Sequence, residues 1–172
     1  MKRYITILTI LCNSLLAQTQ LVEHGIFKHV GFSNQGPIFE DHMKSTLERA
    51  GDNKTELLKA LKQVPAEQKK GMDFLIAYMP EKDLKSLKAD FLLENVALAY
   101  KARETYPWAK QVPEEIFLND VLPYASLNER RDNWRQDFHD RFSKHVKDVK
   151  TMQEAILAIN AAIKKEVNVE YS

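Results

Sequence analysis

The sequence predicts an all-α fold, an irregular bundle of about six to seven helices with a short strand-like tail at its C-terminus. All five glycines occur at or before Gly71, so the second half of the chain lacks the residue that most often marks bulges and tight turns. Apolar residues in that half recur at the three- and four-residue spacings of a helix. The 172 residues fit one domain of roughly 100–200 residues.

Residues 1–17 have the layout of a secretory signal peptide. Lys2 and Arg3 precede an apolar run, and the segment ends on the small residue Ala17. The run is shorter than the ~20 residues that span a bilayer, so we expect no stable membrane insertion. We expect cleavage after Ala17 and a secreted or periplasmic protein. A lipoprotein modified at Cys12 is the alternative, which the large side chain before that cysteine disfavours.

Cleavage would leave 155 of the 172 residues, with 23 basic and 24 acidic side chains and no cysteine. A chain so close to neutral has no overall field for nucleic acid, and without a thiol it forms no disulfide. We expect neither a cofactor nor a metal, because no two histidines stand three or four apart. Convergence of His24 and His29 on a metal is the alternative.

Residues 18–40 hold three of the five glycines and no sustained period, so we expect an irregular lead-in. Helices should follow at 41–50, which ends before Gly51, at 53–64 and at 65–79. Prolines punctuate the last two, since a residue before proline is pushed out of helical geometry. Gly71 within the third costs about 1 kcal/mol relative to alanine, which favours a later start for that helix.

The longest helix should span 81–105 and lie at the centre, because Leu92, Val96 and Ala99 widen its apolar stripe. Asn95 lies on the same face. We therefore expect Asn95 to be a buried polar residue held by the backbone of a loop, and a cleft-lining or ligand-binding role is the alternative.

A short helix should run between Pro113 and Pro123. The patterns Ser126 to Glu129 and Thr151 to Glu154 both match the capping box that opens a helix. We expect the first to open a helix that carries three aromatic residues at spacing four, and the second to open the last helix. The alternating residues from Val167 to Tyr171 predict the strand-like tail.

Other motifs carry little chemistry. Residues 128–141 contain four arginines but also four acidic residues, which favours a salt-bridged helix over a nucleic-acid site. Adjacent carboxylates such as Glu114 and Glu115 are expected in solvated first turns, and Asp137 is expected to pair with Arg141. Asn53-Lys-Thr55 matches the glycosylation triplet, which has meaning only in a eukaryotic secretory pathway.

Much of the chain resembles a known family. The run from Phe91 to Phe142 reads FLLENVALAYKARETYPWAKQVPEEIFLNDVLPYASLNERRDNWRQDFHDRF, and a capped helix at 151–160 and the ending NVEYS follow it. From about Leu57 to Ser172 the sequence resembles the N-terminal region of secreted bacterial transglutaminase-like proteins, members of the papain-like transglutaminase superfamily. The most specific part is VPEEIFLNDVLPYASLNERRDNWR.

The resemblance implies a division into a helical N-terminal domain at 41–143 and, at 144–172, the opening helix and strand of a papain-like core. In that family a Cys, His and Asp triad in the core attacks a carboxamide or peptide carbonyl and forms a thioester. None of the three matches a position in this sequence, so no catalytic residue is carried over. The resemblance leaves open whether the whole protein is a crosslinker, a peptidase, an amidase or an inactive scaffold.

Two functions follow as expectations. In the first, the chain is the non-catalytic front of a transglutaminase-like protein truncated before its core, with that core as its partner and a protein or peptide as the substrate. In the second, it is a self-standing extracytoplasmic binding module. A strand-like tail without a pairing partner favours the first.

Overall fold

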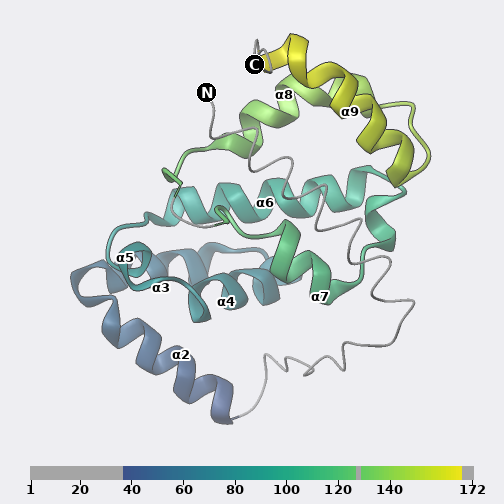
Figure 1. The fold of residues 1–172 in the computed structure, drawn as a ribbon. Coiled ribbons are helices and arrows are strands. Elements are labelled where there is room, and N and C mark those ends of the chain that lie inside the picture. Colours follow the sequence, from purple (N-terminus) through teal and green to yellow (C-terminus); the bar gives the residue numbers. More distant parts are fainter. Residues whose placement is uncertain (1–36, 127–128, 168–172) are drawn as a thin grey trace. The chain divides into compact units, whose positions relative to one another are not determined.

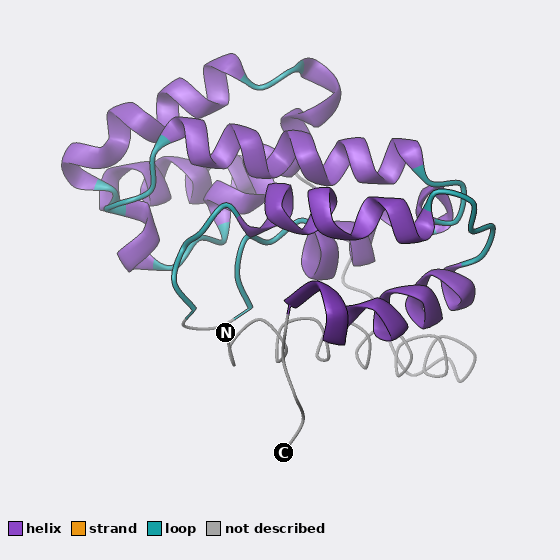
Figure 2. Cartoon of the chain, turned by 90° about the horizontal axis from the view of Figure 1, so that it is seen from above, coloured by secondary structure: helices purple, strands orange, loops and turns teal. Residues whose placement is uncertain are grey.

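The computed structural model describes residues 37–126 and 129–167, and every regular element in them is helical (Figures 1 and 2). The predicted all-α class is confirmed. These residues form eight α-helices rather than six to seven. The leader at 1–17 and most of the lead-in lie outside the described residues. Val167, where the strand-like tail was expected to begin, is the last residue of a helix, and the rest of the tail also lies outside them.

The described chain forms two compact units. The N-terminal unit comprises residues 37–105 and Lys110–Tyr124, and the C-terminal unit comprises Tyr106–Ala109 and the residues from Ala125 onward. The predicted domain boundary after residue 143 falls inside the C-terminal unit.

The N-terminal unit opens with helix α2, Pro37–Arg49. This helix takes in the last residues of the expected lead-in, because proline suits the first turn of a helix. It ends at Arg49, two residues before Gly51, whose φ of +57° is the left-handed conformation that glycine adopts without strain. Helices α3, Lys54–Gln63, and α4, Lys69–Ala77, follow, each preceded by a single 3₁₀ turn.

The predicted helix at 81–105 is two helices, α5 at Glu81–Leu84 and α6 at Ala89–Thr105. Side chains from the preceding elements satisfy the backbone at the break. The Asn53 Nδ2 donates to the carbonyls of Leu84 at 2.9 Å and Leu87 at 2.8 Å. The Glu56 Oε2 accepts from the Ala89 N–H at 2.9 Å, so α6 is capped from α3.

Helix α6 is the centre of the N-terminal unit. It packs against α3 and α4 (Figure 1), and Leu92, Val96 and Ala99 are fully buried, as the stripe predicted. The segment between the two prolines is helical as expected. It begins with α7, Glu114–Ile116, and continues as a π-helical turn, Phe117–Val121, whose first two side chains are buried.

The C-terminal unit contains α8, Trp134–Val146, and α9, Met152–Val167, packed against each other. The two helices share a small core, which comprises Phe138, Phe142, Ile159, Ala162, Ile163 and Val167.

The capping box predicted at Thr151 to Glu154 is formed. The Glu154 N–H donates to the Thr151 Oγ1 at 3.2 Å, and the Thr151 N–H donates to the Glu154 Oε2 at 3.1 Å. The helix expected from Ser126 is wrong, because residues 129–133 are not helical and α8 begins at Trp134. In that stretch the Asp132 N–H donates to the Arg130 carbonyl at 3.1 Å, and the Arg130 Nε lies 2.7 Å from the Asp132 Oδ1.

Candidate functional site

The most distinctive chemistry of the N-terminal unit is a set of buried polar side chains, which we call the polar clamp. It consists of Asn53, Asp83, Asn95 and Tyr124, all less than 10% exposed. Buried polar groups require partners, and the bonds of this set show what each member holds in place.

Asn95 fastens the segment after the π-helical turn to the central helix. Its side chain is 6% exposed, and its Nδ2 donates to the Leu122 carbonyl at 2.9 Å. Leu122 precedes Pro123, which has no N–H to donate, and its own N–H bonds to the Phe117 carbonyl across the π turn. The amide of Asn95 thus serves a backbone group at the end of a helix.

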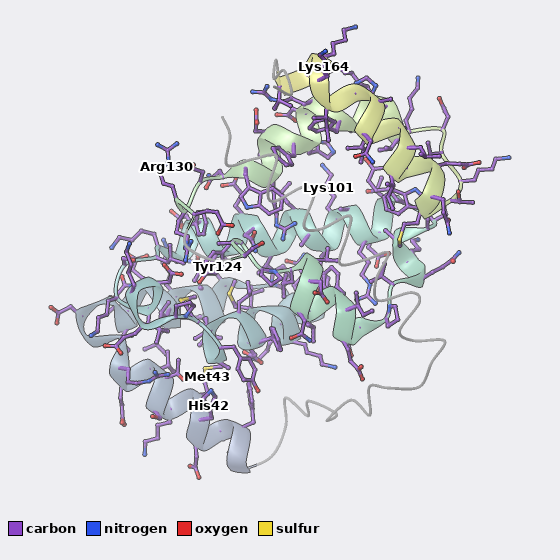
Figure 3. All side chains as sticks on the ribbon, viewed as in Figure 1. His42, Met43, Lys101, Tyr124, Arg130 and Lys164 are labelled. Atoms are coloured by element: carbon purple, nitrogen blue, oxygen red, sulfur yellow. The ribbon has the colours of Figure 1, made fainter. Side chains whose placement is uncertain are left out.

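Tyr124 and Asp83 form the second buried hydrogen bond of the clamp, between two side chains. The Tyr124 hydroxyl donates to the Asp83 Oδ2 at 3.0 Å, and the two residues are 6% and 2% exposed. Figure 3 labels Tyr124, which also packs edge-on against the Phe91 ring, with 5.7 Å between centroids. The pair ties the residues after the π turn to α5.

Sequence reasoning missed Asp83. It stands between Lys82 and Leu84 in the first turn of a predicted helix, where an acidic residue is usually solvated and favoured by the helix dipole. Its burial and its bond to Tyr124 depend on contacts with residues about 40 positions later in the chain, which the sequence does not reveal.

Asn53 completes the clamp and excludes one modification of the folded chain. A glycan on the Asn53-Lys-Thr55 triplet would be attached to Nδ2, and both protons of that atom are already donated to buried carbonyls. Asn53 is only 8% exposed. The native N-terminal unit therefore does not accept a glycan here.

The clamp is suited to holding segments together rather than to chemistry on a bound molecule. A general acid or base must come within hydrogen-bond reach of a substrate, whereas the groups described above bond to one another or to the backbone.

A close approach of two helices lies next to the clamp. A Cβ atom on Gly71 of α4 would lie 2.8 Å from the Tyr100 Cε2 and 3.1 Å from the Leu122 Cδ2. The Tyr100 ring is held edge-on against Phe117, with 5.0 Å between centroids, and its burial raises the pKa of the hydroxyl. Glycine is thus placed inside α4 by packing, which explains its presence in a helix.

His42 and His145 have structural partners. The His42 Nε2 lies 2.8 Å from the Ala77 carbonyl at the end of α4, and the His145 Nε2 lies 2.8 Å from the Glu166 Oε1. His24 and His29 lie outside the described segments. Within those segments, no group of three or more His, Cys, Asp or Glu side chains is placed to hold a metal ion. The predicted pair of Asp137 with Arg141 is confirmed at 2.7 Å.

Within residues 37–126 and 129–167 no helix has the length and apolar composition needed to cross a bilayer. No family model, no curated protein and no solved structure matches the chain.

Proposed function

We propose that this chain is the non-catalytic helical region of an exported transglutaminase-like protein. In this proposal it packs on a cysteine-dependent acyl-transfer or amide-hydrolysis core that the 172 residues do not include, and it shapes the cleft through which a protein or peptide substrate enters. Neither nucleic acid nor a metal has a part in it.

The observation that carries the proposal is the composition of α9. Eight of the nine residues from Ala155 to Ile163 are apolar, a pattern typical of a helix with partners on more than one side. Yet α8 covers only part of α9, and Leu157 is 69% exposed. A further packing partner for α9 accounts for both facts, and the resemblance assigns this helix to the start of the core.

The polar clamp supports the same function. Asn95 and Tyr124 belong to the stretches that carry the resemblance, and their roles are to anchor the segment after the π turn. Residues with such roles suit a rigid region beside a catalytic core, because they fix backbone and leave the chemistry to another part of the protein.

A self-standing extracytoplasmic binding module is the second candidate. Its specific support is an exposed aromatic group at the end of α4. Tyr78 is 47% exposed, with its ring centroid 4.9 Å from that of Phe74 and 5.6 Å from that of His42. Exposed aromatic side chains are enriched in protein interfaces.

Both candidates place the protein outside the cytoplasm, secreted or in a periplasm. We expect mass spectrometry of the exported protein to identify Gln18 as its first residue. A mature chain that still begins at Met1 would contradict export by cleavage.

Sequencing the transcript that encodes the chain separates the two candidates. The first function expects an in-frame segment that encodes a cysteine followed by a histidine and an aspartate, and a transcript without one contradicts it. In such a longer protein, Leu157→Asp should lower the melting temperature of the core, whereas the control Leu157→Met should not. Equal melting temperatures for the two variants would count against α9 as the docking helix.

A further inference from the structure

Three side chains of α8 converge on Glu166 in the last turn of α9. The Lys144 Nζ and the His145 Nε2 each lie 2.8 Å from the Glu166 Oε1. The Arg141 Nη1 donates to the Glu166 backbone carbonyl, also at 2.8 Å. Glu166 thus contacts α8 through both its side-chain carboxylate and its backbone carbonyl.

The backbone contact serves a carbonyl that the helix itself leaves without a partner. The last four carbonyls of a helix accept no intrahelical bond, and Glu166 lies among them. Arg141 is oriented for this contact by Asp137, one turn earlier on α8, at 2.7 Å. Its positive charge also suits the negative end of the α9 dipole.

We propose that Glu166 is the central residue of an acid-resistant latch that holds the last turn of α9 against α8. The latch stands independently of the proposed function. It matters for the C-terminal unit because the shared core of α8 and α9 is small, with three buried residues and three partly buried ones.

The electrostatics of the site give the latch its resistance to acid. Hydrogen bonds from Lys144 and then His145 lower the pKa of the Glu166 carboxyl to about 2 from an ordinary value of 4.5. Because the folded pKa lies below the unfolded one, the carboxylate contributes its full stabilisation above about pH 4.5. Below that pH the contribution decreases progressively, and it is lost completely only when the pH falls below the folded pKa of about 2.

The side chains that contact Glu166 are basic. From α8 it faces Lys144, His145 and Arg141, and Asp137 is already paired with Arg141. On α9 itself the neighbouring Lys164, labelled in Figure 3, and Lys165 are exposed. Lys144 and His145 contact the same oxygen of the carboxylate, so a lysine cation lies beside it as well as an imidazole.

The first test is the titration of Glu166 in the intact chain, followed by carbon-13 NMR of its side-chain carboxyl. We expect a midpoint of about 2. A midpoint near 4.5 would overturn the latch, since it would show a carboxyl without cationic partners.

The second test measures amide hydrogen exchange at residues 163–167 at pH 3. Glu166→Gln should speed exchange by roughly three- to tenfold, as expected for the loss of charged hydrogen bonds, and the control Lys165→Gln should not. Lys144→Met should speed exchange in the native chain but add little in the Glu166→Gln background. Equal exchange for Glu166→Gln and Lys165→Gln, or full additivity of the first two changes, would overturn the proposal.

Discussion

At the scale of single residues, Gly71 is fixed by the ring that packs on it. Tyr100 approaches α4 so closely that even a methyl group at position 71 would collide with it. Phe117 packs edge-on against the ring and limits its withdrawal. A residue that helix propensity disfavours is therefore the one that this packing requires.

We predict that Gly71→Ala destabilises the protein by about 1–2 kcal/mol. Overpacking costs about 1–3 kcal/mol, and the better helix propensity of alanine recovers part of that. Urea unfolding measures the change. In a Tyr100→Ala background, where the ring is absent, the same substitution should be neutral or stabilising. Equal destabilisation in both backgrounds would show that the ring is not the cause.

The sequence predicts residue environments unequally. Asn95 could be predicted because a polar residue stood on an apolar face, and that contrast is visible in the pattern. Its partner, the Leu122 carbonyl, could not, because backbone acceptors leave no mark in a sequence. Asp83 looked like a solvated residue of a first helical turn, and only tertiary structure buries it.

At the scale of elements, the two capping-box patterns show where local rules end. Thr151 to Glu154 forms the reciprocal bonds and opens α9, and the backbone N–H donors of Lys150 and Thr151 lower the pKa of Glu154. Ser126 to Glu129 has the same pattern, yet residues 129–133, which would continue such a helix, are not helical. The Asp132 N–H donates to the Arg130 carbonyl at 3.1 Å, an i to i+2 backbone bond that differs from the i to i+4 bonds of an α-helix.

We predict that Thr151→Ala lowers the free energy of unfolding by about 1 kcal/mol, as is typical of a lost helix cap. Ser126→Ala is the matched control and should change stability by less than about 0.5 kcal/mol, because it removes an exposed hydroxyl from an element that is not a helix. Thermal unfolding followed by circular dichroism compares the two variants. A larger loss for Ser126→Ala would reverse the assignment of the caps.

The break between α5 and α6 was beyond prediction for a related reason. No proline or glycine marks residues 85–88, so the periodic pattern continues through them. The break is stabilised by Asn53 and Glu56, which lie about 30 residues earlier in the chain. Long-range side-chain partners can outweigh local helix propensity.

At the scale of the whole molecule, the chain has two compact units with separate cores. The all-α class was predictable because it depends on periodicity and on where glycine and proline occur. The division before α8 was not, since it depends on which helices contact one another.

We predict that the two units respond separately to core mutations in calorimetry. Leu92→Ala removes a fully buried side chain from the N-terminal unit, and Phe142→Ala does so for the small core of the other. Each should cost about 2–5 kcal/mol in its own unit and lower one melting transition only. A single transition that both variants lower equally would show that the units unfold together.

The buried amide of Asn53 bears on how the protein can be produced. In a eukaryotic secretory pathway the triplet meets the glycosylating enzyme while the chain is still unfolded, when nothing shields the nitrogen. A sugar attached at that moment would block the bonds to Leu84 and Leu87 and keep the N-terminal unit from maturing. Bacterial expression, or replacement of Thr55 by valine in yeast or animal cells, prevents glycosylation at Asn53.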